Sequence, residues 1–213
     1  MIFENELIAG VLIKRYKRFF VDIKVKNKLI TAHCPNTGSM MGLLKKGNKV
    51  WFTENNDIKR KLKYTLQIIE VNGKKVGINT HITNKIFYEA LKSGKILNLK
   101  KSDKLFREKN FNSKTRFDFF IENGGRGCFI EVKNVTLSRL KNLAEFPDAI
   151  TERGLKHISE LIEAKKRGYE IYLAFVIQRE DCKKFKIAED IDQKYKKLLT
   201  FAQKNKLKVI CYD

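Results

Sequence analysis

Two acids and a lysine, Asp118, Glu131 and Lys133, are the residues of this chain whose types and spacing could do chemistry. Two carboxylates and an ammonium on one surface suit a hard divalent cation and an activated water molecule. These three residues are therefore the catalytic candidates. Because Lys and Glu are abundant in the chain, a solvated strand face with a cross-strand ion pair is the alternative interpretation.

Two short strands must position these side chains. Polar and apolar residues alternate through residues 116–121 and again through residues 128–133, as they do in strands. This alternation predicts Phe117 and Phe119 on one face and Asp118 on the other. An Asn-Gly-Gly turn between the two runs tolerates positive φ and predicts a hairpin. Asp118 would then lie beside the Glu-x-Lys pattern of the second strand.

The remaining sequence predicts two domains, residues 1–80 and residues 81–213. The first contains six short runs rich in β-branched and aromatic residues, with tight turns and no helical pattern. This make-up is typical of a small β-barrel of the oligonucleotide/oligosaccharide-binding (OB) type. The expected strands are residues 7–16, 19–25, 28–32, 49–53, 64–71 and 75–78.

The second domain mixes helical and strand patterns and predicts a mixed sheet covered by helices. The expected helices are residues 83–93, 151–167 with Thr151 as N-cap, and 192–205. The expected strands are residues 95–99, 104–109, 116–121, 128–133, 171–178 and 207–212. The predicted fold class is therefore α+β: an OB-like barrel followed by a mixed-sheet α/β domain.

The charge balance indicates a polyanionic partner. The chain has 45 Lys and Arg against 24 Asp and Glu, a net charge of +21. The excess is spread along the chain, with 16 against 6 in residues 1–80 and 29 against 18 in residues 81–213. Nucleic acid is favoured over an anionic membrane because neither a lipid anchor nor a basic amphipathic helix stands out. A Lys-rich compositional bias without a ligand is the alternative.

One group of candidate DNA contacts lies near residue 16. Arg15, Tyr16, Lys17 and Arg18 combine cations, which can follow phosphates, with a ring that can stack on a base. The alternative is that Tyr16 and Phe19 belong to the barrel core and that the cations are merely solvated.

A second group lies in the later domain. Arg153, Lys156 and His157 share the first turns of the expected helix with its free amides, which attract phosphate. A capped helix with a solvated basic face is the alternative. Arg116, beside the catalytic candidate Asp118, completes the predicted DNA contacts.

The cysteines exclude a disulfide scaffold. They are widely spaced and form no Cys-x-x-Cys, so we expect reduced thiols, no disulfide partner and a cytoplasmic protein. The four are Cys34, Cys128, Cys182 and Cys211. His33 and Cys34 lack a second ligand pair, so a structural loop is favoured over a metal or catalytic site. No apolar run predicts a membrane span or a signal peptide.

Five segments of the chain resemble the sugar fermentation stimulation protein (SfsA) family. The segments are Ala32-His-Cys-Pro-Asn-Thr-Gly-Ser-Met40, Asn79-Thr80 with Asn84, Arg116-Phe-Asp-Phe119, Glu131-Val-Lys-Asn-Val-Thr-Leu137, and Phe146-Pro-Asp-Ala-Ile-Thr-Glu-Arg-Gly154 with Lys156-His157. The resemblance implies an OB-like N-terminal domain and a C-terminal domain similar to PD-(D/E)xK nucleases. It also implies DNA binding with little sequence preference and a role in the control of sugar catabolism.

The resemblance also implies roles for individual residues. In the nuclease core the acids hold Mg²⁺ or Mn²⁺, and the lysine, here Lys133, orients or deprotonates water. The implied metal ligands are Asp118, Glu131, the main chain of Val132, and Glu89 from the first helix. Glu108 is the rival of Glu89.

Three functions follow from these observations. The favoured one is a DNA-binding protein that recognises the phosphate backbone. The second is a Mg²⁺- or Mn²⁺-dependent nuclease acting through Asp118, Glu131 and Lys133. The third is an interaction module without nucleic-acid function. The sequence makes no prediction about oligomeric state.

Overall fold

The computed structural model describes residues 3–55, 59–96, 99, 104–123 and 126–213. Contacts within the chain divide it into two compact units. Unit 1 comprises Met1–Ile82, Val135–Asp148 and Gln178–Lys186, and unit 2 comprises Thr83–Asn134, Ala149–Ile177 and Ile187–Asp213. Two segments that follow residue 80 thus belong to unit 1. The domain boundary near residue 80 stays a prediction.

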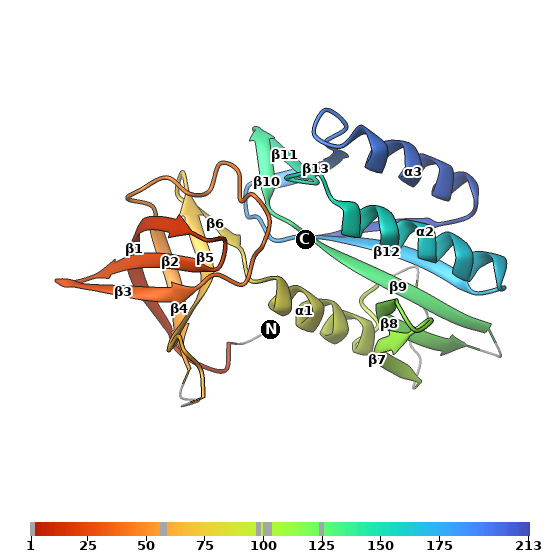
Figure 1. Cartoon of the computed structure of the whole chain (residues 1–213), viewed down its shortest axis with the longest axis horizontal. Coiled ribbons are helices and arrows are strands. Elements are labelled where there is room, and N and C mark those ends of the chain that lie inside the picture. The colour runs from red at the N-terminus through yellow and green to blue at the C-terminus, as the bar shows by residue number, and fades with distance from the viewer. Residues whose placement is uncertain (1–2, 56–58, 97–98, 100–103, 124–125) are drawn as a thin grey trace. The chain divides into compact units, whose positions relative to one another are not determined.

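Unit 1 is built on a β-barrel (Figure 1). Its strands are β1 (Leu7–Tyr16), β2 (Phe20–Val25), β3 (Lys28–His33), β4 (Lys49–Glu54), β5 (Tyr64–Val71) and β6 (Lys74–Gly77). The sheet order is β3-β2-β1-β4-β5-β6, and a parallel pairing of β3 with β5, which places Ala32 opposite Tyr64, closes the barrel. Each predicted strand agrees with the observed one to within a residue at either end.

The barrel interior holds the side chains that alternation along the strands predicts. Buried residues from every strand form one apolar cluster, in which Leu12, Ile23 and Phe52 are almost completely inaccessible to solvent. Burial of such side chains supplies the main stabilisation of the barrel.

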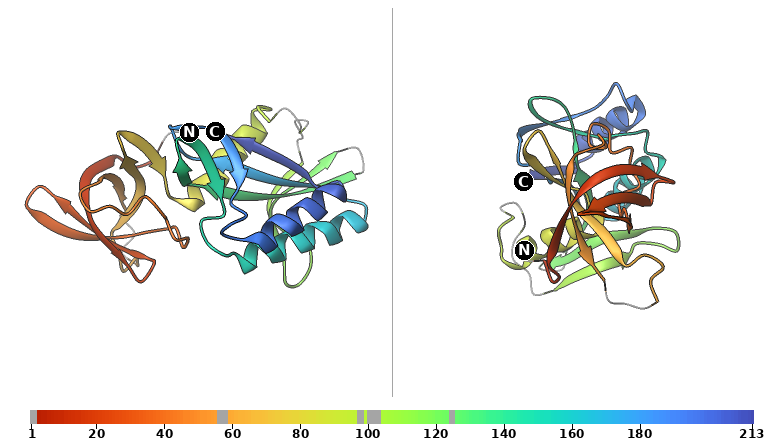
Figure 2. Two further views of the ribbon diagram at one scale, coloured as in Figure 1. Left: turned by 90° about the horizontal axis from the view of Figure 1, so that it is seen from above. Right: turned by 90° about the vertical axis from the view of Figure 1, so that its left-hand side faces the viewer.

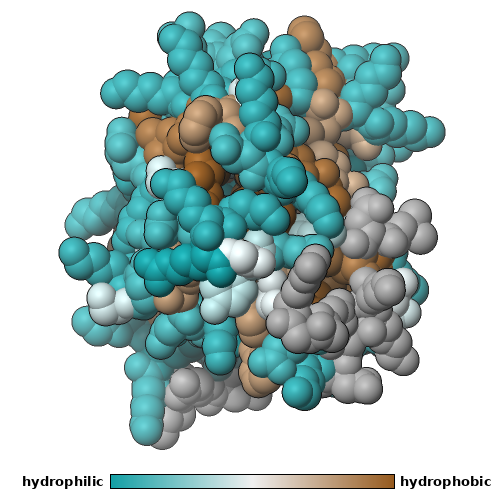
Figure 3. Space-filling model, turned by 90° about the vertical axis from the view of Figure 1, so that its right-hand side faces the viewer, coloured by the Kyte–Doolittle hydropathy of each residue, from teal (hydrophilic) through white to brown (hydrophobic). Residues whose placement is uncertain are grey.

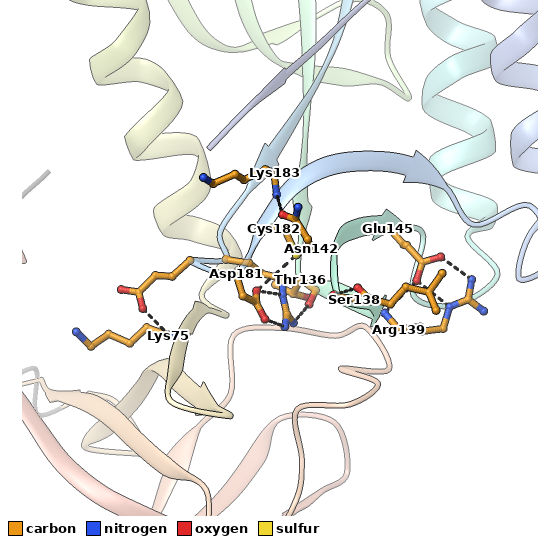
Figure 4. Close-up of polar contacts among 12 residues, drawn as sticks. Lys75, Thr136, Ser138, Arg139, Asn142, Glu145, Asp181, Cys182 and Lys183 are labelled. Atoms are coloured by element: carbon orange, nitrogen blue, oxygen red, sulfur yellow. Dashed lines mark hydrogen bonds and ion pairs between the residues drawn. The ribbon is translucent and has the colours of Figure 1, made fainter.

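Unit 1 also contains a small sheet that the sequence did not predict. Its strands are β10 (Leu137–Leu140), β11 (Asn142–Phe146) and β13 (Cys182–Ile187), in the order β10-β11-β13. Polar contacts hold it together (Figure 4). Arg139 forms two hydrogen bonds to the Glu145 carboxylate through Nε and Nη2, at 2.9 and 2.8 Å, and the Asn142 Oδ1 accepts a hydrogen bond of 2.7 Å from the amide of Lys183.

A buried arginine anchors the segment that leads into β13. Arg179 donates a hydrogen bond of 2.7 Å to the carbonyl of Thr136 and two hydrogen bonds of 2.8 Å to the carboxylate of Asp181. Arg179 also forms a β-bridge with Val76 of β6. These bonds place residues 178–186 within unit 1, although they lie far from the barrel in the sequence.

Unit 2 contains the expected mixed sheet. Its strands are β7 (Leu105–Asn110), β8 (Arg116–Asn123), β9 (Arg126–Val135), β12 (Glu170–Ile177) and β14 (Lys208–Tyr212), in the order β14-β12-β9-β8-β7. β12 and β14 are parallel, whereas β7, β8 and β9 are antiparallel. The predicted fold class is confirmed. Residues 124–125 of the predicted turn lie outside the described residues.

One predicted strand, residues 95–99, is not supported. Residues 97 and 98 lie outside the described residues, and residues 95, 96 and 99 do not belong to a strand. Gly94, with a φ of 69°, ends the preceding helix, and the amide of Lys95 bonds back to its last turn.

Helices cover both faces of the mixed sheet (Figure 2). They are α1 (Thr80–Lys92), α2 (Glu152–Lys166) and α3 (Gln193–Lys204). On one face, Phe87 and Leu91 of α1 pack in the apolar cluster that includes Ile130. α2 packs on β12 and on α3 on the other face. Thr151 caps α2 as predicted, and its hydroxyl accepts a hydrogen bond from the amide of Gly154.

The structure bears on two expectations, that no segment spans a membrane and that the cysteines form no disulfide. Within the described ranges, no helix has both the length and the apolar character needed to cross a membrane. All four cysteines are free thiols, as predicted.

Candidate functional site

The strand alternation of β8 breaks at Asp118. Phe117 packs on Phe129 with ring centroids 5.2 Å apart, on the side of the sheet covered by α2. Phe119 packs instead against Phe87 of α1, at 5.5 Å, on the opposite side. The expectation that Phe117 and Phe119 share a face is therefore wrong, because their rings pack on opposite sides of the sheet.

The neighbouring strand β7 is irregular at the same place. The register pairs Arg107 and Lys109 with β8, which leaves Glu108 opposite Asp118. Glu108 has a φ of 51°, in the left-handed region that residues other than glycine rarely adopt. Irregularities of this kind re-aim side chains next to functional sites. We attribute to it the turn of Asp118 toward α1.

Hydrogen bonds fix both oxygens of Asp118. Asn84 of α1 donates from Nδ2 to Oδ1 at 2.7 Å, and the main-chain amide of Val132 donates to Oδ2 at 2.8 Å. Burial, and then the negative charge of Glu131, raise the pKa of Asp118 to about 6; the bonds from Val132 and Asn84 and the charge of Lys133 oppose this shift. The two carboxylates are thus close enough to repel each other.

Glu131 is held through one oxygen only. It is 3% exposed, and its Oε1 accepts a hydrogen bond of 2.8 Å from Nζ of Lys133 and contacts Nδ1 of His157. Its Oε2 is buried and has no hydrogen-bond partner among the described residues. Burial alone would raise the pKa of Glu131, but Lys133 and His157 outweigh it and lower that pKa.

The two acids fit a divalent cation. The described residues include no group of three His, Cys, Asp or Glu side chains arranged to hold a metal ion. Mg²⁺, however, is commonly bound by one or two carboxylates together with water and substrate phosphates. The unpartnered Oε2 of Glu131 and the repulsion between Glu131 and Asp118 are both features that a cation would relieve. The predicted carbonyl ligand from Val132 stays a prediction.

Asn84, rather than an acid, is the α1 residue seen at Asp118. Glu89 lies five residues further along α1 in an exposed position, and its role as a ligand stays a prediction. Its rival Glu108 forms an exposed ion pair of 3.2 Å with Arg116. Asn84 belongs to one of the family motifs of the sequence, which predicted no role for it.

Arg15, a predicted DNA contact, forms hydrogen bonds to the loop that follows β3. Its guanidinium donates hydrogen bonds to the carbonyls of Asn36 at 2.7 Å, Gly38 at 3.1 Å and Arg18 at 3.0 Å. Three of its five N–H donors are thus already used within unit 1. The sequence could not show this, because the acceptors are main-chain atoms.

The other residues of this group are accessible. Tyr16 is 37% exposed and Phe19 is 46% exposed, so the alternative that they belong to the barrel core is wrong. The Tyr16 ring stacks on Phe20 with centroids 5.5 Å apart. Lys17 and Arg18 are exposed in the β1–β2 turn.

The α2 group is split by the structure. Arg153 and Lys156 are exposed, and Nζ of Lys156 bonds to the carbonyl of Lys114 at 2.9 Å. His157 is 8% exposed and faces Glu131 and Lys133, instead of solvent. The helical spacing of the buried α2 residues could have shown this. They are Gly154, His157, Ile158, Leu161 and Ala164.

Hydrogen bonds within unit 1 connect two of the family motifs, the one that ends at Met40 and the one that begins at Phe146. Ser39 donates from its hydroxyl to the carbonyl of Asp148 at 2.6 Å, and the amide of Met40 bonds to the Asp148 carboxylate at 2.9 Å. A Cβ on Gly38 would lie 2.6 Å from the same carboxylate, so no larger residue fits without movement. These bonds accord with the structural interpretation of the loop that follows His33 and Cys34.

Comparisons with known proteins agree along the whole chain. Residues 13–78 match the family model of the SfsA N-terminal OB domain, and residues 81–213 match that of the sugar fermentation stimulation protein RE domain. A sugar fermentation stimulation protein homolog from Pelagibacter ubique (strain HTCC1062) is 50% identical over 213 residues, which cover 100% of this chain and 92% of the relative. A homolog from Maricaulis maris (strain MCS10) is 39% identical over 214 residues, covering 100% and 91%.

A solved structure shares the architecture. SfsA from Pyrococcus furiosus, in complex with Ca²⁺, is 25% identical and superposes with a TM-score of 0.89, covering 99% of this chain and 89% of that one. The chain belongs to the sugar fermentation stimulation protein (SfsA) family.

Proposed function

We propose that this SfsA-family chain binds DNA through its phosphate backbone, with little preference for sequence. The observation that carries the proposal is the net charge of +21 in a folded chain. Hydrophilic side chains cover most of the face drawn in Figure 3. Binding of a polyanion to such an excess of positive charge is favourable, because it releases counterions.

The exposed cations near the predicted sites are the contacts we favour. Unit 1 offers Lys17 and Arg18 beside the accessible ring of Tyr16, and unit 2 offers Arg153 and Lys156 in the first turns of α2. Phosphate contacts of this kind position a protein on DNA without reading its sequence.

A gel-shift assay tests the proposal. Two duplexes of equal length and unrelated sequence should bind with similar affinity. Lys17→Gln with Arg18→Gln should weaken both by about tenfold or more. A charge-matched control, Lys45→Gln with Lys46→Gln, alters two exposed cations of another turn of unit 1 and should weaken binding less. Absence of binding at low salt would contradict the proposal.

A second candidate function is metal-dependent hydrolysis of phosphodiesters. Two observations favour it: the charge of Glu131 acts on Asp118, and Oε2 of Glu131 is buried with no hydrogen-bond partner among the described residues. A bound Mg²⁺ or Mn²⁺ would supply positive charge to the phosphate undergoing attack. Asp118 and Glu131 would hold it, and Lys133 would position a water molecule. The Ca²⁺ complex of the Pyrococcus furiosus relative supports a cation in this family.

Incubation of plasmid and single-stranded DNA with purified protein tests this second function. Cutting should require Mg²⁺ or Mn²⁺ and should be abolished by Asp118→Asn and by Glu131→Gln. Glu189→Gln, which changes an exposed acid in the turn before α3, is the control and should cut normally. Cutting without metal, or cutting that survives both changes, would exclude this mechanism.

We further propose a cytoplasmic location and a role of DNA binding in the regulation of sugar catabolism. The free thiols support the first proposal. The family name supports the second.

A further inference from the structure

His157 lies in the acidic site without having been assigned a part in it. Its Nδ1 contacts Oε1 of Glu131 and lies 3.2 Å from Nζ of Lys133. A carboxylate beside an ammonium can only accept, so Nδ1 carries the proton and donates to Glu131. Lys133 and His157 are thus two donors to one oxygen, and they do not bond to each other.

This arrangement determines how the other oxygen of Glu131, Oε2, is hydrogen-bonded. Both donors use Oε1, while Oε2 is buried and has no hydrogen-bond partner within the described residues. A buried carboxylate oxygen left without a donor is costly unless a ligand takes it. With Lys133 as its sole donor, Glu131 could turn and offer both oxygens to the lysine.

The imidazole is held firmly enough to impose this orientation. It is 8% exposed, and its ring packs at 76° to the ring of Phe117, with centroids 6.5 Å apart. One turn earlier in α2, a Cβ on Gly154 would lie 2.9 Å from the ring of Tyr195, so α2 sits close against α3. The helix therefore has little room to move His157 away from Glu131.

We propose that His157 is a positioning residue, which together with Lys133 occupies Oε1 of Glu131 and so keeps Oε2 for a divalent cation. The inference rests on the proposed cation site and adds a residue from α2 to it. Outer-shell partners of metal ligands act in this way, and their loss commonly weakens metal binding about 10–100-fold.

Binding of Mn²⁺ to the full chain, measured by calorimetry without DNA, tests this role. His157→Phe keeps the ring but removes the donor, and it should weaken Mn²⁺ binding by about 10-fold or more. His157→Asn places an amide nitrogen where Nδ1 lies, and it should bind within about threefold of wild type. His81→Phe, at an exposed histidine, is the control and should bind like wild type.

Each outcome decides the matter. If His157→Phe binds Mn²⁺ as tightly as wild type, or if His157→Asn binds as weakly as His157→Phe, the role of His157 is overturned and the cation site stands. If wild type does not bind Mn²⁺, or if Asp118→Asn binds it equally well, the cation site is wrong and His157 loses its role with it. Should His157→Phe fail to fold, as judged by circular dichroism, His157→Leu replaces it.

Discussion

Asp118 is the residue on which the site depends most. Asn84 and Val132 fix its two oxygens, while Glu131 opposes its charge. Burial and a neighbouring negative charge destabilise the ionised form of a carboxyl group, and a bound cation would stabilise it. Its ionisation should therefore be visible in the stability of the cation-free protein.

The first prediction concerns that stability in EDTA. The pKa of Asp118 is about 6 in the folded chain against an ordinary value of 3.8. Between these values the folded state binds more protons, so the free energy of unfolding falls as pH rises from about 4 to about 6, by up to about 3 kcal/mol, and then levels off. Urea denaturation of wild type and Asp118→Asn should show this fall in wild type alone. Parallel profiles would contradict it; Glu189→Gln, at an exposed acid in the turn before α3, should follow wild type.

The second prediction concerns Asn84. Its amide donates to ionised Asp118 and so lowers that pKa. Asn84→Ala should therefore raise the pKa of Asp118 above about 6, as measured by ¹³C NMR titration of the side-chain carboxyl. Ser93→Ala, beyond the C-terminal end of the same helix, should leave it unchanged. An unchanged pKa in Asn84→Ala would show that this hydrogen bond does not form in solution.

At the scale of elements, two N-cap residues mark the starts of α2 and α3. Thr151 accepts one hydrogen bond, from the amide of Gly154 at 3.0 Å. Asp192, the N-cap of α3, is 4% exposed and accepts two, from the amides of Tyr195 at 2.9 Å and Thr151 at 3.0 Å. Asp192 therefore ties the start of α2 to the start of α3.

The third prediction compares these caps. Thr151→Ala should cost about 1 kcal/mol of unfolding free energy, and Thr151→Ser should restore most of it. Asp192→Ala should cost about 2–4 kcal/mol, because it also leaves the half-buried amide of Thr151 without an acceptor. Urea denaturation measures both. Equal costs would mean that the bond between Asp192 and the amide of Thr151 contributes nothing.

The elements also show what could be predicted from the sequence. The barrel strands, the capped α2 and the apolar run of β12 followed from local patterns, because burial imposes a period of two or 3.6 residues. The small sheet β10-β11-β13 did not, since short polar strands joined by side chains such as Arg179 and Arg139 leave no period to detect.

The site was predicted in part for a related reason. Lys133 pairs with Glu131, and the charge of Glu131 acts on Asp118. The break in alternation at Asp118, which we attribute to Glu108 in the neighbouring strand, was not predicted. His157 was grouped with solvent-facing cations, because a histidine suits either place. The helical spacing of the other buried α2 residues places it on the face that packs against the sheet.

At the scale of the whole molecule, charge is the feature that both units share. Unit 1 contains Lys17 and Arg18, and unit 2 contains Arg153 and Lys156, all exposed. A net charge of +21 opposes folding through self-repulsion and is relieved when a polyanion binds. DNA should therefore stabilise the chain as well as bind to it.

The dependence of DNA affinity on salt tests the central claim most directly. Fluorescence anisotropy of a labelled duplex, measured from about 50 to about 200 mM NaCl, gives the association constant at each concentration. If several phosphates are neutralised, its logarithm should fall linearly with the logarithm of salt, with a loss of about 10³-fold over this range. An affinity that stays constant with salt, or no binding at the lowest concentration, would contradict the account.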